Sequence, residues 1–209
     1  MKLFFVRHGE SEANVMNMMS NRGWIHGLTE KGKAQAAGLA QEIKHLPFKR
    51  VYASPLKRTV ETAELLAEPL GLSVETHAGL REVDSGILEG KSDEESWKIF
   101  FKIFYDWFED QNWDSKVEEG DSLNDLRARF LPALENILAE NEDGDHILIV
   151  SHAGVLTTLL PFVLDNVGHK FSYENPLNNI DMIVAHKNGD GLICEKWGNV
   201  SAEKLRTAD

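Results

Sequence analysis

The apolar run His-Ile-Leu-Ile-Val at residues 146–150 places the strongest constraint on the fold of this chain. A strand that is apolar on both faces must be covered on both faces, as the central strand of a parallel sheet is when helices pack on each side of it. Residues 154–164 predict the helix that follows this strand, and the apolar run at residues 2–6 predicts a second buried strand. This is the pattern of an α/β protein.

Strand-like and helical segments alternate along the rest of the sequence. Further strands are predicted at residues 50–53, 74–77, 181–186 and 192–197, the last two joined by the hairpin signal Asn188-Gly189-Asp190-Gly191. Helices are predicted at residues 28–46, from Pro55 to about residue 67, from the capping box Ser92-Asp93-Glu94-Glu95 to about residue 109, and from Ser122 onward with a kink at Pro132. We expect a three-layer α/β sandwich with a mostly parallel central sheet, helices on both faces and an antiparallel edge strand.

Nothing in the sequence divides the chain into separate domains. It contains no internal repeat, no low-complexity tract and no linker rich in Pro, Gly or Ser. Its 209 residues, 42% of them hydrophobic, are enough to form one substantial core. We therefore expect a single domain over residues 1–209, with an aromatic-rich helical insertion at about 92–120.

Aromatic side chains are concentrated in residues 97–113, where several recur at helical spacing and the charged residues lie largely opposite. The pattern fits a helix packed on the domain, a lid that makes a substrate pocket apolar, or a homo-oligomer interface. A helix lying on a membrane surface is disfavoured, because the polar face is mixed rather than basic.

Basic and imidazole side chains follow the predicted parallel strands. Arg7 and His8 come directly after the first strand. Arg58 lies one turn into the helix after the second strand, and His152 comes two residues after the run that ends at residue 150. The carboxyl ends of parallel strands share one edge of the sheet, where the N-termini of the following helices also direct free N–H groups. The sequence therefore predicts an anion site at this edge.

The types of side chain at this edge indicate phosphoryl chemistry. The two guanidiniums supply forked donors matched to phosphate oxygens, which is enough for binding. The imidazoles indicate catalysis as well as binding, because a neutral ring nitrogen can attack phosphorus. Nearby positive charge disfavours protonation of His8 and so keeps its ring neutral. A leaving alkoxide needs a proton, and the acidic loop at residues 80–90 offers Glu82, Asp84 and Glu89 as candidate donors.

Five short motifs occur within residues 3–160. They are Phe5-Val6-Arg7-His8-Gly9-Glu10-Ser11-Glu12-Ala13-Asn14, Leu28-Thr29-Glu30-Lys31-Gly32, Ser54-Pro55-Leu56-Lys57-Arg58-Thr59 with Glu61-Thr62-Ala63, Leu80-Arg81-Glu82, and Val150-Ser151-His152-Ala153-Gly154. In this order they resemble the motifs of the histidine phosphatase (phosphoglycerate mutase-like) superfamily. The resemblance implies a phosphohistidine at His8, Glu82 as the proton donor, and no metal or organic cofactor.

The resemblance also assigns residues that hold the substrate. It implies that Arg7, Arg58 and His152 grip the phosphoryl group. Lesser contacts are implied for Asn14 and for the backbone N–H of Ala153. Ser20 or Gly23 would add contacts from the loop at residues 15–27, although this loop departs from the family pattern in length and is rich in Met.

The family holds both phosphatases and mutases. Its mutases usually carry His-Tyr-Gly after the proton-donor Glu and a paired Arg farther on, whereas Val-Asp-Ser follows Glu82 here and no Arg-Arg pair occurs. We therefore predict a histidine acid phosphatase-type phosphoric monoester hydrolase acting on a small phosphorylated metabolite. Phosphoglycerate mutase-type transfer and a non-catalytic phospholigand-binding protein are the alternatives. A metal hydrolase using two His and a Glu would differ from all of these in losing activity to a chelator.

The formal net charge of −12 has the wrong sign for a protein that binds nucleic acid or an anionic membrane through a broad basic surface. No run reaches the roughly 18 uncharged apolar residues that a membrane span needs. The N-terminal segment meets Arg7 and His8 too early for a signal peptide. We expect a cytoplasmic protein without nucleic acid or membrane partners, and a homo-oligomer formed through the aromatic helix stays an open alternative.

Overall fold

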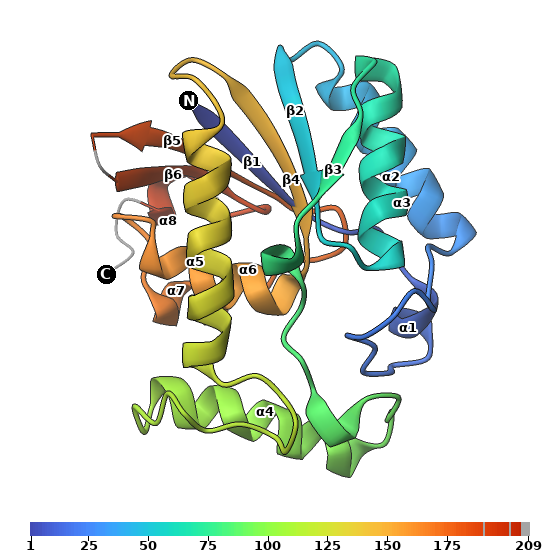
Figure 1. Cartoon of the computed structure of the whole chain (residues 1–209), viewed down its shortest axis with the longest axis vertical. Coiled ribbons are helices and arrows are strands. Elements are labelled where there is room, and N and C mark those ends of the chain that lie inside the picture. The colour runs from blue at the N-terminus through green and yellow to red at the C-terminus, as the bar shows by residue number, and fades with distance from the viewer. Residues whose placement is uncertain (190, 201, 206–209) are drawn as a thin grey trace.

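A central six-stranded sheet organises the computed structural model, which describes every residue except 190, 201 and 206–209 (Figure 1). Its strands are β1 (Lys2–Arg7), β2 (Phe48–Ala53), β3 (Val74–Thr76), β4 (His146–Ser151), β5 (Met182–Asn188) and β6 (Gly191–Trp197), arranged in the order β3-β2-β4-β1-β5-β6. The first four are parallel to one another, while β5 pairs antiparallel with β1 and β6 pairs antiparallel with β5. The predicted mostly parallel sheet with an antiparallel edge is confirmed.

Helices cover both faces of this sheet. On one side lie α2 (Glu30–Ile43) and α3 (Lys57–Ala67), and on the other lie α5 (Leu123–Ala139), α6 (Ala153–Leu159) and α7 (His169–Glu174) (Figure 1). The aromatic-rich α4 (Glu94–Phe108) lies across the end of the sheet at which the parallel strands finish. Two short helices, α1 (Glu12–Val15) and α8 (Ala202–Leu205), complete the set. Among the described residues, no helix combines the length and the apolar character of a membrane span.

Alternate side chains of the central strands build two separate cores. In β1, Leu3 and Phe5 belong to the core under α5 and α6, whereas Phe4 and Val6 belong to the core under α2 and α3. The side chains of β4 divide between the two cores in the same way. Because successive strand residues point to opposite faces, a central strand with two covered faces must be apolar at every position. This explains the continuous apolar run at residues 146–150.

The predicted elements recur with small shifts at their ends. Ser122 caps α5 as expected, through a capping box with Asp125, and α5 continues through Pro132 to Ala139. The predicted cap at Ser92 is wrong, because Asp93 caps α4 by accepting the backbone N–H of Ser96 at 2.9 Å.

The helix after β4 is shorter than the predicted residues 154–164. It ends at Leu159 and tightens into a 3-10 turn, Leu160–Phe162, where Pro161 lacks the N–H that an α-helix needs. The predicted pairing of β5 with β6 is present at the antiparallel edge of the sheet. Asp190, in the turn between these strands, lies outside the described residues.

The strand register brings the predicted reactive residues to the same level. Val6 of β1 and Ala53 of β2 both pair with Val150 of β4. His8 and His152 therefore each lie two residues beyond a paired position, at the carboxyl edge of adjacent strands. The backbone N–H of His8 donates to the carbonyl of Ser151 at 3.1 Å, which extends the pairing to this point.

The backbone of the loop after β1 packs closely against the backbone at the start of α2. The backbone N–H of Thr29 donates to the carbonyl of Glu10 at 3.0 Å, and a methyl group added to Gly32 would collide with that same carbonyl. Only glycine therefore fits at position 32, because the Glu10 carbonyl occupies the space of a Cβ. Gly38, on the same helix, has open space around its Cα.

We expect the two glycines to respond to alanine with opposite signs. Gly32→Ala should lower the free energy of unfolding by about 1–3 kcal/mol, because backbone atoms must move apart. Gly38→Ala should raise it by about 0.5–1 kcal/mol, because alanine loses less conformational entropy in a helix. Urea unfolding of both variants checks this, and a stabilising Gly32→Ala would contradict the close approach.

Candidate active site

A pocket of about 280 Å³ opens at the carboxyl edge of the parallel strands. Its polar side is lined by Arg7, His8, Arg58 and Glu82, which come from four separate segments of the chain. Asn14, Ser20 and Ala153 also line it, together with Met18, Met19, Trp97, Phe100, Phe101 and Phe104. The structure thus brings together one imidazole, two guanidiniums and one carboxylate around a single small space.

The imidazole of His8 is neutral, and its unprotonated nitrogen lies at the pocket. It is only 3% exposed, and its Nδ1 lies 2.7 Å from the carbonyl oxygen of Gly9. Since a carbonyl only accepts, Nδ1 carries the proton, and Nε2 is the acceptor of the Arg58 Nε–H at 3.0 Å. Burial, followed by the charges of Arg58 and Arg7, holds the pKa of His8 well below its usual 6.5.

Arg58 lies at the centre of the site. Its side chain is 6% exposed, and besides His8 it contacts the carbonyl of Ser20 at 2.7 Å and Nδ1 of His152 at 3.1 Å. Burial lowers the pKa of Arg58 to about 10, so the guanidinium is still a cation at neutral pH. No ion pair joins Arg58 to Glu61, although their spacing on α3 would allow one. The Glu61 carboxylate instead accepts the backbone N–H of Leu28 at 2.6 Å and lies 3.9 Å from Nζ of Lys57.

His152 lies behind Arg58 rather than on the pocket wall. Its ring is completely buried, with its centroid 5.2 Å from that of His8. Because Nδ1 accepts from Arg58, Nε2 carries the proton and donates to the hydroxyl of Ser54 at 2.8 Å. Burial, then the charge of Arg58, holds the pKa of His152 well below 6.5.

Arg7 supplies the second cation of the pocket. One guanidinium nitrogen donates to the carbonyl of Leu177 at 2.6 Å, while the buried Nε has no hydrogen-bond partner within the described structure. Burial lowers the pKa of Arg7, and the charges of Glu82 and Asp181 oppose that effect. A buried N–H without a partner is a donor that a bound anion can satisfy.

Glu82 is the carboxylate that faces the pocket. It accepts backbone N–H groups from Val155 at 2.8 Å, from Val83 at 3.0 Å and from Gly154 at 3.1 Å, so the start of α6 holds it in place. Gly154 permits this approach, since a Cβ there would lie 2.6 Å from a Glu82 oxygen.

The other two acidic candidates of this loop are engaged elsewhere. Asp84 pairs with Arg22 at 2.9 Å, and Glu89 accepts the backbone N–H groups of Asn21 and Arg22. Neither of them lines the pocket. The three candidates that chemistry alone left open are therefore distinguished by position.

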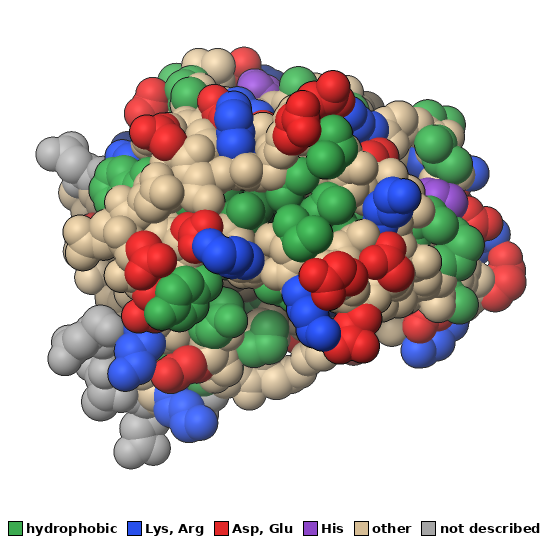
Figure 2. Space-filling view, turned by 90° about the horizontal axis from the view of Figure 1, so that it is seen from below, with side chains coloured by type: hydrophobic (Ala, Val, Ile, Leu, Met, Phe, Trp, Pro, Cys, Tyr) green, Lys and Arg blue, Asp and Glu red, His purple; other side chains and the backbone are tan. Residues whose placement is uncertain are grey.

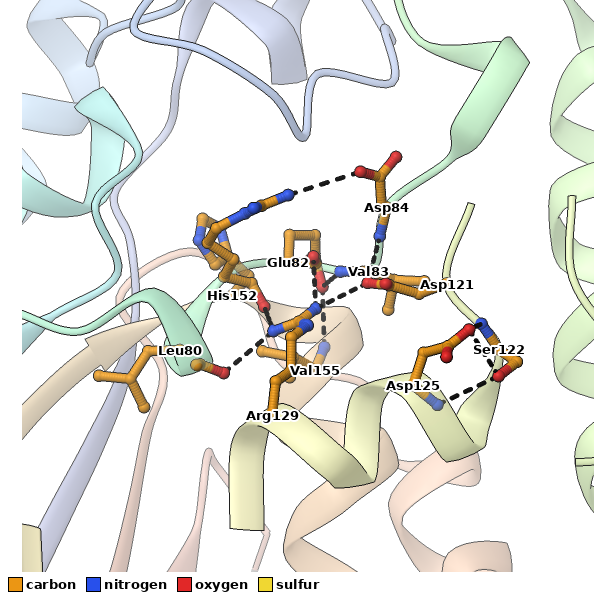
Figure 3. A network of polar contacts seen from close by, with 12 residues as sticks. Leu80, Glu82, Val83, Asp84, Asp121, Ser122, Asp125, Arg129, His152 and Val155 are labelled. Carbon is orange, nitrogen blue, oxygen red and sulfur yellow. Dashed lines mark hydrogen bonds and ion pairs between the residues drawn. The ribbon is translucent and has the colours of Figure 1, made fainter. Parts of the chain in front are cut away.

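Arg129 supports the segment that carries Glu82, and no sequence pattern had marked it. From α5 it donates to the carbonyls of Gly79, Arg81 and Glu82 at 2.8–3.0 Å and to the Asp121 carboxylate at 2.9 Å. Figure 3 shows this guanidinium beneath the segment between Leu80 and Val83. An arginine in the middle of an amphipathic helix gives no local sign of such a role.

The predicted lesser contacts are placed unequally. Asn14 is exposed at the pocket, where its side-chain oxygen accepts from Asn179, and the carbonyl of Ser20 is turned toward Arg58. Ala153 lines the pocket as the first residue of α6. Gly23 does not line this pocket and borders a separate groove with Arg22 and Trp24.

Two supporting contacts of the His8 segment were not predicted, although Thr62 lies within one of the five motifs. Asn179 donates to the carbonyl of His8 at 3.1 Å, and Thr62 of α3 accepts the backbone N–H of Gly9 at 3.1 Å. Asn179 comes from the loop before β5, far away in sequence. Within the described residues, no group of three or more His, Cys, Asp or Glu side chains is arranged to hold a metal ion.

The family model of the histidine phosphatase superfamily, branch 1, matches residues 3–200. The chain belongs to the histidine phosphatase superfamily. Proteins that match it carry the names of phosphatases and of mutases, so membership in this superfamily supports enzyme activity without choosing between the two reactions.

Relatives of this superfamily member cover most of its length. The probable phosphoglycerate mutase GpmB of Erwinia tasmaniensis is 30% identical over 211 residues, which cover 96% of this chain and 94% of that protein. The 6-phosphofructo-2-kinase/fructose-2,6-bisphosphatase of Aquarana catesbeiana is 31% identical over 85% of this chain, but only 36% of its own length is matched. The structure of YhfR from Bacillus stearothermophilus has a TM-score of 0.82 at 26% identity, covering 96% of this chain and 98% of that one.

The lowered pKa values predict how the stability of this histidine phosphatase superfamily member depends on pH. Below about pH 6.5 the unfolded chain protonates His8 and His152 while the folded chain does not, so the free energy of unfolding falls as pH decreases. Each imidazole contributes at most about 1.4 kcal/mol per pH unit. Above about pH 6.5 both states are neutral and the effect vanishes.

Urea unfolding between about pH 7.5 and pH 5.5 measures this slope. The matched control is the double variant His8→Gln/His152→Gln, which should show a shallower loss of stability over that range. His146 and His169, whose pKa values burial also lowers, contribute with the same sign in both proteins. An equal slope for the native chain and the double variant would contradict the lowered pKa values.

Proposed function

We propose that this chain is a phosphatase that hydrolyses a small phosphomonoester through a phosphohistidine at His8. The observation that carries the proposal is the state of the His8 ring. Its Nε2 is unprotonated, lies at the pocket and is contacted by the buried cation of Arg58. An imidazole nitrogen with a free electron pair beside an anion site is an activated nucleophile.

In the first step, Nε2 of His8 attacks phosphorus and the bond from phosphorus to the ester oxygen breaks. Arg58 shifts its Nε–H from the ring nitrogen to a phosphoryl oxygen, and Arg7 offers its unpartnered Nε–H to another. Glu82, in its protonated form, donates a proton to the leaving oxygen. The alcohol then departs and leaves a phosphoryl group on His8, stabilised by guanidiniums whose charge is fixed in advance.

In the second step, water attacks the phosphohistidine. The Glu82 carboxylate takes a proton from that water, the bond from nitrogen to phosphorus breaks, and Nε2 regains its electron pair. The proton held by Nδ1 and the Gly9 carbonyl stays in place throughout. His152 keeps Arg58 oriented from behind, and its direct contact with the phosphoryl group stays a prediction.

Hydrolysis is favoured over transfer by the charges of the pocket. Among the described residues that line it, Arg7 and Arg58 are the only cations, and both lie at the His8 end. A mutase must retain a phosphorylated product while transferring the group back to it, which calls for further cations beyond those that hold the phosphoryl group. The similarity to a probable phosphoglycerate mutase keeps transfer as the second candidate.

The central test replaces the nucleophile. His8→Ala should lower phosphate release from aryl phosphates by at least about a thousandfold, because the covalent route is lost. Quenching of the native chain with alkaline detergent during turnover of labelled substrate should trap a base-stable, acid-labile phosphoryl label that His8→Ala lacks. Chelator should leave the native rate unchanged, because the proposed steps use only side chains of this chain.

Three results would contradict or redirect this proposal. Equal activity in His8→Ala and the native chain would remove the phosphohistidine. Loss of activity in chelator, restored by a divalent metal, would favour a metal hydrolase. In a parallel screen of phosphorylated metabolites, an isomeric phosphoester without free phosphate would favour the mutase.

The position of the proton donor has a separate test. Glu82→Gln should slow alkyl phosphates by about 100-fold or more and nitrophenyl phosphate much less, because a good leaving group needs no proton. Gly154→Ala should reproduce part of this pattern, since its methyl group displaces the Glu82 carboxylate. Adding Gly154→Ala to Glu82→Gln should cost little more, and full additivity of the two losses would show that Gly154 acts independently of Glu82.

A further inference from the structure

The side of the pocket away from His8 is an apolar wall. Trp97, Phe100, Phe101 and Phe104 of α4 line it, and Met18 and Met19 of the loop at residues 15–27 continue it. Phe101 is 60% exposed although it lines the pocket, so its ring is available to a ligand. Figure 2 views the molecule from the side that carries α4 and shows exposed apolar side chains between charged ones.

The charged side chains of the pocket all lie at the end where His8 is. Of the described lining residues, only Arg7, Arg58 and Glu82 carry charge. A second anionic group on the substrate would meet the apolar wall without a partner, and removing an ion from water without pairing it is costly. The formal net charge of −12 adds a general repulsion. The wall therefore disfavours a substrate with a carboxylate or a second phosphate.

The wall is fixed in place by contacts across its two segments. The indole N–H of Trp97 donates to the carbonyl of Asn17 at 2.8 Å, which ties α4 to the loop. The backbone of Met19 exchanges hydrogen bonds with Gly90 and Lys91 at 2.8 and 2.9 Å. Trp97 also stacks on Phe101, with ring centroids 5.3 Å apart and planes 25° apart. The rings are thus ordered before a ligand arrives, which reduces the entropic cost of binding.

From these contacts we infer that the alcohol portion of the substrate is uncharged, apolar and of aromatic size, and that it packs on the α4 wall with Phe101 as its principal contact. This inference rests on the proposed function, since it places the phosphoryl group at His8. A flat ring added to the stack of Trp97 and Phe101 gains area burial and ring–ring contact together. Phe101 is then a specificity-determining residue that takes no part in the transfer of the phosphoryl group.

The test compares three aryl phosphates whose leaving phenols have similar acidity: 2-naphthyl, phenyl and 4-carboxyphenyl phosphate. Because their chemical steps are closely matched, differences in kcat/KM report contact with the wall. We expect the native chain to prefer 2-naphthyl over 4-carboxyphenyl phosphate by about tenfold or more, with phenyl phosphate between them.

Variants at one helix position separate the wall from the chemistry. Phe101→Ala should lower kcat/KM for 2-naphthyl phosphate by about tenfold, mainly through KM, and change phenyl phosphate less. Phe101→Arg should reverse the preference toward 4-carboxyphenyl phosphate, because the carboxylate gains a partner. Tyr105→Ala is the matched control, since Tyr105 is 59% exposed on the same helix and does not line the pocket. It should leave the preference unchanged.

The possible outcomes separate failure of the inference about the wall from failure of the proposed function. Turnover of all three esters at similar kcat/KM, unaffected by either Phe101 variant, would overturn the inference and leave the phosphatase intact. If no ester is turned over, the proposed function fails. Calorimetric binding of the three esters to the His8→Ala variant then decides the inference, since tighter binding of 2-naphthyl phosphate supports the wall and equal binding overturns it.

Discussion

The buried guanidinium of Arg58 is the interaction on which the candidate active site depends. It donates to both imidazoles and to the carbonyl of Ser20, so three segments of the chain meet at one side chain. All of these direct partners are neutral, so the cation is buried without a counter-ion in contact. The same charge helps to hold the pKa values of His8 and His152 low, which fixes both rings as neutral. A phosphoryl group would supply the missing negative charge, so the chemistry and the binding preference have one electrostatic origin.

This arrangement is possible because the sheet delivers its groups at a common level. The strands β1, β4 and β2 finish in register, and the residues just beyond them face one another across adjacent strands. The polar groups behind the site then set orientation. Arg58 fixes the tautomer of His152 by donating to its Nδ1, the Gly9 carbonyl fixes the tautomer of His8, and Arg129 supports the segment that carries Glu82. The contacts of His8 and Arg129 end on backbone carbonyls, whereas His152 is held by the side chains of Arg58 and Ser54.

The sequence predicted those features of the fold and of the site that depend on residues close together in the chain. Apolar runs predict buried strands, and residues that follow such strands predict the edge at which a site forms, so His8 and His152 could be proposed early. Arg129 and Asn179 could not, because each acts across a long sequence separation and lies in an otherwise ordinary helix or loop. Chemistry alone could not choose among the acidic residues of the loop at 80–90. The family resemblance pointed to Glu82, and only the folded chain shows that Asp84 and Glu89 are engaged elsewhere. The cap of α4 was missed by one residue, since Ser92 and Asp93 are both good capping residues.

The absence of a second set of cations among the described pocket residues bears on both the reaction and the substrate. An alcohol that is held only by apolar contacts is bound without direction and without charge pairing, so it leaves freely once its bond to phosphorus breaks. Water can then reach the phosphohistidine before the product can take the phosphoryl group back. A mutase needs the opposite, namely charged groups that retain and turn its intermediate. Under the proposed function, the aromatic helix α4 therefore decides two properties at once: which esters enter, and that water accepts the phosphoryl group.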